Sequence, residues 1–471
     1  MDKNIVLRLG ILCSIIVTSA DLFAEIKLPA IFGNNMVLQQ QTDVAVWGTA
    51  DKNSAVEVIT SWNNKKYSTK AEEDGHWKLK VATPKAGGPY NLTISDGKVL
   101  TLENVLIGEV WVCSGQSNMT MPLKGYPNQP IIGSLDAIVS PPDPMMRFFT
   151  VKRELSIKPL DNFKGEWDTC NPESISEFSA TAFYFGQMLQ KILNVPVGLI
   201  HSSWGGTTIQ PWMSEGNCKE FDFIKLVTET PESKVTPRTP TVLYNSMINP
   251  MVGYGIRGTI WYQGEANRSE PENYQKMLPA MINDWRTKWG IGEFPFYYVQ
   301  IAPHGEGQNL AYLREAQLKV STATPNVGMA CILDVGEQEE IHPANKETVS
   351  KRLAYLALSQ TYKIKGINGS SPVYKAMKLI KDTAILTFEN APNGLTSFGK
   401  ELSNFEIAGA DKKFYPAKAV IIKEGVSLKS SSVAEPVAVR YAFKSFVEGD
   451  LFGTNGIPVS SFRTDDWPRE K

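Results

Sequence analysis

The sequence predicts an α/β fold: a doubly wound parallel sheet with an N-terminal β-sandwich and a β-rich C-terminal region. Short alternating strands separated by turn residues fill the first part of the chain. Apolar runs then alternate with helical segments, and strand patterns return near the end. We therefore expect a signal segment at 1–24, the sandwich at 25–104, the α/β domain at 105–365 and the accessory region at 366–471.

The first residues have the order typical of an export signal. Lys3 and Arg8 supply positive charge, residues 11–17 form an apolar run, and Ala20 and Ala24 are small residues suited to cleavage. The apolar run is shorter than the roughly 20 residues that span a bilayer. We expect the mature chain to be periplasmic or secreted, without a membrane-spanning segment.

Charge and cysteine content exclude several classes of function. Lys and Arg number 48 and Asp and Glu 49, so no excess of positive charge favours binding to nucleic acid. One of the five cysteines, Cys13, lies in the signal segment, and the spacing of the others matches no zinc pattern. We expect no metal and no cofactor, and the sequence does not determine whether a disulfide forms.

Both flanking regions have strand patterns. Five segments before residue 105 alternate apolar and polar side chains, with Asn, Asp, Gly and Pro between them. These segments are VAVWGTA, AVEVIT, KKYSTKA, HWKLKVA and YNLTIS. After about residue 366, AILTFEN and VAVRYAF indicate further strands. Neither region carries an obvious catalytic motif.

The central region alternates strands with helices. Its expected strands are VLIGEVWVCSG, VPVGLIHSSWGG, IRGTIWYQGEA, FPFYYVQIAP and VGMACILDVG, and its expected helices cover 180–193, 274–289, 310–322 and 346–362. This alternation is typical of a parallel sheet with helices on both faces. Because the active site of such a sheet forms at the carboxyl ends of its strands, polar residues that follow them are candidates.

The segment GQSNM follows the first of these strands. Gly115 permits a sharp turn, after which Ser117 can present its hydroxyl and a backbone N–H to a substrate. The hydrolase motif G-x-S-x-G is not matched, because Met119 occupies its last position. A serine after a strand is more often a helix N-cap, so Ser117 needs partners. Cys113, an alternative nucleophile, lies within the strand and is expected to pack.

Four histidines allow the general base to be selected by elimination. His76 lies in the β-sandwich, and His201 and His304 follow strands, where each could be functional or simply hydrogen-bonded. His342 lies in a loop after the last central strand, and three glutamates between residues 337 and 340 precede it in the sequence. A carboxylate that accepts from one imidazole nitrogen fixes the tautomer that a general base needs. The alternative is a helix-capping histidine beside a solvated acidic stretch.

Two further motifs place polar groups at strand ends. In IWYQGEAN, Gln263 can donate N–H to a developing oxyanion, and Gly264 permits close backbone approach. In SSWGGT, the two glycines could offer a backbone donor, and Trp204 offers a flat surface. Each motif is weak alone, because glycine-rich turns often only reverse the chain.

Together these segments resemble the sialate O-acetylesterase family, a branch of the SGNH-type hydrolases. The segments that carry the resemblance are GEVWVCSGQSNM, SSWGGT, IWYQGEAN and DVGEQEEIHP. The resemblance implies an SGNH-hydrolase-like catalytic domain and a serine esterase that removes acetyl groups from sugars, foremost from O-acetylated sialic acid. Ser117 matches the family nucleophile and His342 the base, and the reaction would pass through an acetyl-serine.

The resemblance also implies an oxyanion hole made by the Ser117 N–H, a glycine of SSWGG (assigned to Gly206) and Gln263. The other residues expected to line the oxyanion and substrate site are Trp204, Gln116, Glu265 and Asn267. The chain departs from its relatives at the acid, since they commonly carry Asp two residues before the histidine. Glu340 stands there and is the first choice, with Glu339 and Asp334 as alternatives.

Two other functions remain open at this stage. One is an acetyl esterase that acts on xylan or another glycan, because loops between shared motifs set sugar specificity. The other is a non-catalytic carbohydrate-binding protein that uses Trp204, Trp212 and the β-rich regions. The sequence determines neither the acetylated sugar nor the oligomeric state.

Overall fold

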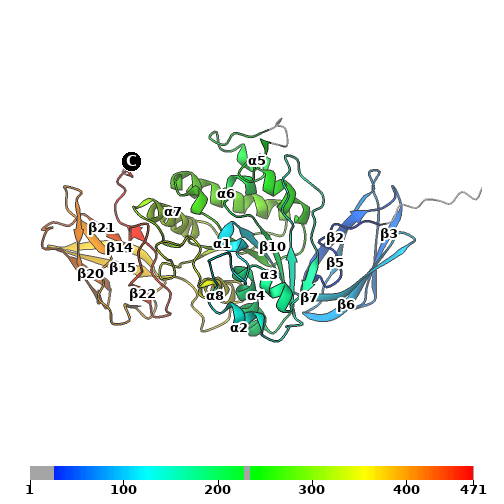
Figure 1. The fold of residues 1–471 in the computed structure, drawn as a ribbon, viewed down its shortest axis with the longest axis horizontal. Helices are drawn as coiled ribbons and strands as arrows, with labels where there is room; N and C mark the ends of the chain where they lie inside the picture. The colour runs from blue at the N-terminus through cyan, green and yellow to red at the C-terminus, as the bar shows by residue number, and fades with distance from the viewer. Residues whose placement is uncertain (1–25, 228–233, 470–471) are drawn as a thin grey trace, which may run out of the picture.

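The computed structural model describes residues 26–227 and 234–469. The expected signal segment lies outside these residues. Figure 1 shows the N-terminal strands at one end, the α/β domain in the middle and the β-rich C-terminal region at the other end. The predicted α/β fold class is confirmed. Among the described residues, no helix is long and apolar enough to cross a bilayer.

The N-terminal region contains the five expected strands and one more. They are β1 (Val37–Gln39), β2 (Asp43–Thr49), β3 (Ala55–Thr60), β4 (Lys65–Lys70), β5 (His76–Ala82) and β6 (Gly87–Ser95). β2 pairs with β5, while β3 pairs with β4 and β6. In β3 the alternation places Val56 and Val58 in the core, as expected for a half-buried strand.

The longest strand joins the first two regions. β7 (Val99–Gly115) has 17 residues. Its first part pairs with β6 and β1, and its last part pairs with β10 and β11. The expected boundary at 104/105 therefore falls inside one continuous strand that the N-terminal region and the central sheet share.

The central sheet has the strand order β13-β12-β11-β7-β10-β8-β9. Its remaining strands are β8 (Met146–Thr150), β9 (Trp167–Thr169), β10 (Val197–Ser203), β11 (Gly258–Tyr262), β12 (Phe296–Val299) and β13 (Val327–Ala330). All neighbouring pairs are parallel except β8 with β9. The carboxyl ends of β7, β8, β10, β11, β12 and β13 consequently lie along the same edge.

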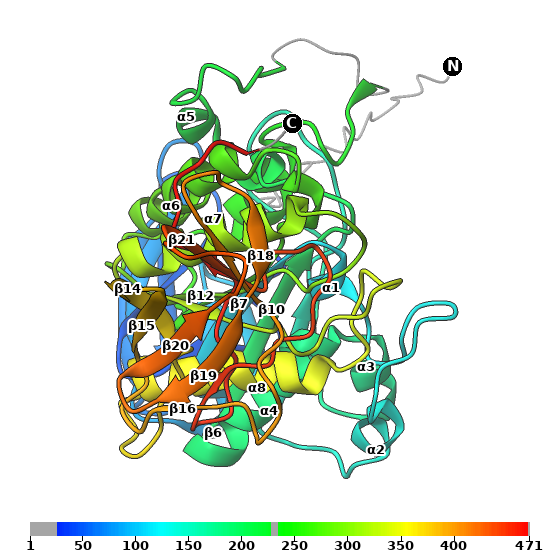
Figure 2. The same cartoon turned by 90° about the vertical axis from the view of Figure 1, so that its left-hand side faces the viewer.

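Helices cover both faces of this sheet, with α4 (Ala180–Leu193) and α8 (Lys346–Leu356) on one side and α6 (Pro271–Trp289) and α7 (Asn309–Ala323) on the other (Figures 1 and 2). Alternate strand residues face the two layers. Trp111 of β7 packs on Phe185 of α4 at a centroid distance of 5.1 Å, whereas Trp261 of β11 packs on Trp285 of α6 at 6.0 Å. Each such fully buried ring stabilises the fold by about 2–3 kcal/mol.

Local chemistry sets the ends of these helices. Pro271 begins α6, where its missing N–H costs nothing, and Gly290 ends it in the left-handed conformation. Ser179 caps α4 by accepting from the Ala182 N–H. The short α-helices are α1 (Ser117–Thr120), α2 (Ser134–Ile138), α3 (Pro172–Glu177) and α5 (Glu215–Cys218). Turns of 3₁₀-helix cover Gln210–Trp212, Asn249–Met251 and Glu265–Asn267, and turns of π-helix cover Tyr244–Ile248 and Ala357–Thr361.

The C-terminal region forms small antiparallel sheets that lie in front of the α/β domain in Figure 2. Its strands are β14 (Val373–Ile380), β15 (Thr383–Glu389), β16 (Leu395–Thr396), β17 (Phe405–Ala408), β18 (Phe414–Pro416), β19 (Lys418–Ile422), β20 (Gly425–Lys429), β21 (Ala438–Tyr441), β22 (Phe452–Gly453) and β23 (Phe462–Arg463). Arg314 of α7 is fully buried and donates to Ser461 Oγ (3.0 Å) and to the Ser445 carbonyl (3.0 Å). These bonds hold the accessory region against α7.

Candidate active site

Ser117 and His342 meet at the carboxyl edge of the sheet. Ser117 follows β7 as the first residue of α1, and His342 lies in the loop between β13 and α8. Although 225 positions separate them in sequence, His342 Nε2 lies 2.7 Å from Ser117 Oγ. This distance is short enough for direct proton transfer from the hydroxyl to the imidazole.

The turn before Ser117 requires a glycine. Gly115 has φ +139°, and a Cβ at this position would lie 2.1 Å from the Tyr262 carbonyl oxygen of β11. No side chain fits in that space, and the conformation itself is unfavourable for other residues. The next residue, Gln116, donates its N–H to the same carbonyl at 2.9 Å. The turn therefore presses the nucleophile loop against the end of β11.

Gln129 occupies the position expected for the acid. Its Oε1 lies 2.8 Å from His342 Nδ1, and its Nε2 donates to Glu340 Oε2 at 3.0 Å. An amide oxygen only accepts hydrogen bonds, so the imidazole proton lies on Nδ1. Nε2 then has a lone pair directed at the Ser117 hydroxyl, which is the tautomer of a general base.

The predicted acids thus lie elsewhere than on the imidazole. Glu340 does not contact the imidazole itself: it accepts from Gln129, and Gln129 contacts His342. Asp334 instead pairs with Arg352 of α8, with contacts of 2.6 and 2.7 Å. The side chain of Glu339 is exposed. The direct carboxylate–imidazole contact expected from the sequence is replaced by two hydrogen bonds, which join Glu340 to His342 through the Gln129 amide.

Burial keeps His342 neutral. Desolvation lowers the pKa of His342 to about 4, and the positive charge of Lys346 and the neighbouring His304 act in the same direction. The uncharged Gln129 amide does little to oppose them. The imidazole is therefore unprotonated, and able to accept a proton, at neutral pH.

A buried polar network joins the serine loop to the histidine loop. Asn118 Nδ2 donates to Glu265 Oε1 (2.7 Å) and to the Ile341 carbonyl (3.0 Å), while its Oδ1 accepts from Lys346 Nζ. Burial raises the pKa of Glu265 and lowers the pKa of Lys346 to about 7. Glu265, expected at the substrate, instead lies beneath the site with 1% of its surface exposed.

The glycine nearest the nucleophile is Gly205. A Cβ on Gly205 would lie 3.4 Å from Ser117 Cβ, so this residue packs directly against the serine. Gly206, the assigned glycine, is one residue farther along, with φ +72°, and its carbonyl accepts from Arg238 Nε at 2.8 Å. Gly205, rather than Gly206, is therefore the glycine of this turn that lies against the nucleophile.

Both N–H groups of the Gln263 side chain are used in hydrogen bonds within the protein, so neither is left for an oxyanion. Its two Nε2 hydrogens go to the Thr207 carbonyl (3.1 Å) and to Asn267 Oδ1 (2.8 Å). Asn267 in turn accepts from the Ile209 N–H at 3.0 Å. Gln116 Oε1 accepts more weakly from the Gly264 N–H at 3.4 Å. Among the expected lining residues, these three side chains are buried and tie the loops after β7, β10 and β11 together.

Trp204 is an expected lining residue whose side chain reaches the surface. It is partly buried, it directly precedes Gly205, and the guanidinium of Arg153 lies 5.6 Å from its ring centroid. Tyr126 borders the pair, because its ring packs edge-on against His342 at 5.6 Å and its hydroxyl lies 3.4 Å from the Ser117 carbonyl. Tyr126 thus contacts both members of the pair, and Trp204 precedes the glycine that packs on Ser117.

The other histidines at this edge have different surroundings. His201 is buried, and its Nε2 lies 2.6 Å from Ser203 Oγ, which contacts Thr120 Oγ1 at 2.7 Å. Burial lowers the pKa of His201 to about 4. His304 is half-buried, and its Nδ1 lies 3.2 Å from the Ala302 carbonyl. Within residues 26–227 and 234–469, no group of three or more His, Cys, Asp and Glu is placed to hold a metal ion.

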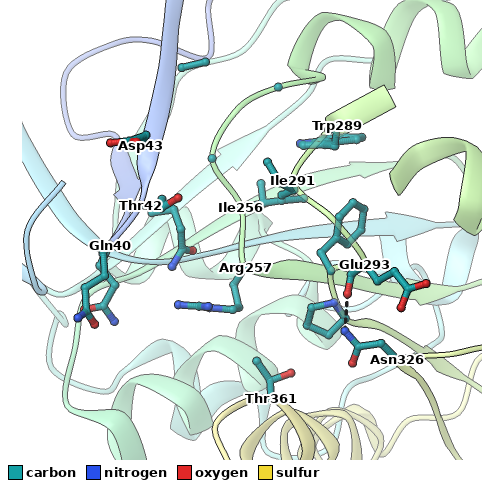
Figure 3. Close-up of a pocket in the computed structure, with 18 of the residues that line it drawn as sticks. Gln40, Thr42, Asp43, Ile256, Arg257, Trp289, Ile291, Glu293, Asn326 and Thr361 are labelled. Atoms are coloured by element: carbon teal, nitrogen blue, oxygen red, sulfur yellow. Dashed lines mark hydrogen bonds between the residues drawn. The ribbon is translucent and has the colours of Figure 1, made fainter. Parts of the chain in front are cut away.

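A cavity of about 600 Å³ lies at the opposite edge of the sheet (Figure 3). Arg257 precedes β11, Glu293 precedes β12 and Asn326 precedes β13, so these lining residues mark the amino ends of the strands. Ser117 lies at the carboxyl end of the same parallel sheet. The cavity is therefore separate from the site that contains Ser117 and His342.

Sequence reasoning missed Tyr126 and four other residues of the site. Asn118 and Gly205 lie inside motifs that had been singled out, so their positions carried a signal. Lys346 begins α8, four residues after His342. Gln129 lies in a loop between α1 and α2 with no periodicity or motif around it. Only the folded chain brings Gln129 to the imidazole.

Known proteins are similar to this chain in sequence and in fold. A family model described as "Carbohydrate esterase, sialic acid-specific acetylesterase" matches residues 107–358. The sialate O-acetylesterase of Pongo abelii is 29% identical over 465 residues, covering 89% of this chain and 88% of that protein. The human sialate O-acetylesterase is 29% identical over 405 residues, or 76% of each chain. A crystal structure of a carbohydrate acetylesterase from Xanthomonas citri matches with a TM-score of 0.87 and 34% identity, covering 94% of this chain and 100% of that one.

Proposed function

Because the chain belongs to the carbohydrate esterase family of sialic acid-specific acetylesterases, we propose that it deacetylates O-acetylated sialic acid through an acetyl-Ser117 intermediate. At the level of the family, it is a carboxylic ester hydrolase that cleaves O-acetyl esters on sugars. The sugar, the roles of individual residues and export from the cytoplasm are parts of the proposal.

Acylation begins at the Ser117–His342 pair. His342 Nε2 removes the hydroxyl proton as Ser117 Oγ attacks the acetyl carbonyl carbon. Negative charge develops on the carbonyl oxygen, and the backbone N–H groups of Ser117 and Gly205 are the donors assigned to it. Gln129 Oε1 keeps the Nδ1 proton in place, so that the protonated imidazole points its new N–H at the leaving oxygen.

Collapse of the tetrahedral intermediate releases the sugar. His342 protonates the sugar oxygen as the C–O bond breaks, which leaves Ser117 acetylated. Water then attacks the acetyl carbonyl with His342 again as the base, and acetate departs as His342 returns the proton to Ser117 Oγ. Tyr126 and Trp204 flank these steps and offer apolar surface to the acetyl group and the sugar.

The 2.7 Å contact between His342 Nε2 and Ser117 Oγ is the observation that carries this proposal. Ser117→Ala and His342→Ala should each lower the rate of p-nitrophenyl acetate hydrolysis by about 10⁴-fold or more. Ser176→Ala is a matched control, because the hydroxyl of this half-buried serine on α3 bonds only within its own helix. Unchanged hydrolysis by Ser117→Ala would refute a serine esterase and leave a binding protein.

Substrate choice needs a separate measurement. Purified protein should release acetate from 9-O-acetyl-N-acetylneuraminic acid with a higher kcat/KM than from acetylated xylan. The reverse order would assign the chain to glycans without sialic acid. Expression with the native N-terminus, followed by N-terminal sequencing of the exported product, tests cleavage near Ala24.

A further inference from the structure

Charged side chains lie on both sides of Ser117. In the strand order β13-β12-β11-β7-β10-β8, the loops that follow β10 and β8 lie on one side of Ser117. The His342 loop, which follows β13, lies on the other side. That loop contains three glutamates, at 337, 339 and 340, of which the first two are exposed. Arg153 follows β8 on the opposite side.

The guanidinium of Arg153 is placed where it can bind a ligand. Its side chain is exposed, and its guanidinium lies over the Trp204 ring at 5.6 Å. Among residues 26–227 and 234–469, no carboxylate pairs with it. Burial raises the pKa of Tyr126, while the charge of Arg153 acts in the opposite direction. Its field therefore reaches the ring that contacts both Ser117 and His342.

A second guanidinium lies against the same turn. Arg238 donates from Nε to the Gly206 carbonyl at 2.8 Å, and its side chain is exposed. This contact leaves its two terminal nitrogens for other acceptors. Trp204, Gly205 and Gly206 thus have one arginine at each end, and the middle residue packs on the nucleophile. Two arginines at one turn are a typical arrangement for binding a carboxylate.

We propose that Arg153, assisted by Arg238, binds a carboxylate of the substrate, so that the enzyme selects acetylated sugars that carry an acid group. The inference rests on the proposed function, and it identifies the acidic sugar by its charge. A carboxylate on the Arg153 side avoids the glutamates of the His342 loop. The sugar is thereby oriented with its acid toward β8 and its acetyl ester over Ser117. Neutral acetylated xylose units lack this anchor.

A pair of substrates that differ only in charge tests this inference. The pair is 9-O-acetyl-N-acetylneuraminic acid and its C1 methyl ester, with acetate release measured for each. The wild type should prefer the free acid. Arg153→Gln should lower the ratio of the two kcat/KM values by about tenfold, mainly through KM, as expected for loss of a charge-assisted hydrogen bond. Arg153→Lys should retain part of the preference, because it keeps the charge and loses the planar fork.

Lys152→Gln is the matched control. It removes one positive charge from the same loop, but the Lys152 charge acts on Asp168, beyond β8. Its ratio should equal that of the wild type. Equal wild-type kcat/KM for acid and ester, or an unchanged ratio in Arg153→Gln, would overturn the anion site alone. Failure of the wild type to act on either compound would overturn the proposed substrate, and the anion site with it.

Discussion

Moving the negative charge one residue closer to His342 tests the role of Gln129. In the native chain the amide of Gln129 separates the Glu340 carboxylate from the imidazole, with hydrogen bonds of 3.0 and 2.8 Å. The exchange Gln129→Glu with Glu340→Gln preserves both hydrogen bonds. The new amide at 340 donates to the new carboxylate, which then accepts directly from Nδ1. The double variant therefore has the same number of charges and a conventional triad.

The size of the effect follows from the distance. Burial, Lys346 and His304 together hold the pKa of His342 at about 4. A carboxylate within about 4 Å raises the pKa of an imidazole by about 1–3 units. Because the ring is partly exposed, the lower half of that range applies. The acid limb of kcat/KM against pH should move upward from about pH 4 by about 1–2 units. The same charge stabilises the imidazolium formed during attack, so kcat above pH 8 should rise by about tenfold.

The assay is hydrolysis of p-nitrophenyl acetate by stopped-flow or plate reader between pH 3.5 and 9. Gln129→Glu alone is an informative intermediate, because its new carboxylate faces that of Glu340 and the two repel. Its acid limb should be the least steep of the series, as the pair titrates together. Glu340→Gln alone keeps an amide on Nδ1 and should shift the limb little. An acid limb that stays at the same pH in a well-folded double variant would refute the role assigned to Gln129 between Glu340 and His342.

Three further substitutions test the architecture beneath the site. Gly115→Ala forces a Cβ against the Tyr262 carbonyl at positive φ, and should cost about 3 kcal/mol or more of unfolding free energy in urea. Gln263→Ala should lower unfolding free energy by about 1–3 kcal/mol together with kcat, whereas a pure oxyanion donor would lower kcat about 10²-fold or more with unchanged stability. Lys346→Met leaves Glu265 as an uncompensated buried group, so thermal stability should fall, and adding Glu265→Gln should restore it. Thermal melts that show no such rescue would contradict the coupling.

The sequence by itself determined the local elements where one pattern dominates. Helical spacing predicted α4 with the bounds that the structure has, and alternation predicted β2 to β6. Strand β8 was missed because its five residues, MRFFT, form a short run without apolar–polar alternation, although the turn residues SPPDP come just before it. The boundary expected at 104/105 lies within β7, since a change of pattern marks a change of neighbours rather than a break in the chain.

The site divides in the same way. Ser117 and His342 were candidates because each follows a strand, and parallel strands end at a common edge whatever their separation in sequence. The resemblance of their motifs to a known family then singled them out. The sequence also marked the glycine turn, but it offered two adjacent glycines, and only packing shows that Gly205 touches the serine.

Tertiary structure alone decided the partner of His342. Spacing along a chain reports periodicity and turn chemistry, which depend on neighbours within a few residues. The contact with Gln129 depends on where a loop 213 positions away comes to rest. Because that amide occupies the position beside Nδ1, Glu340, the acid predicted there, bonds to Gln129 instead of to the imidazole.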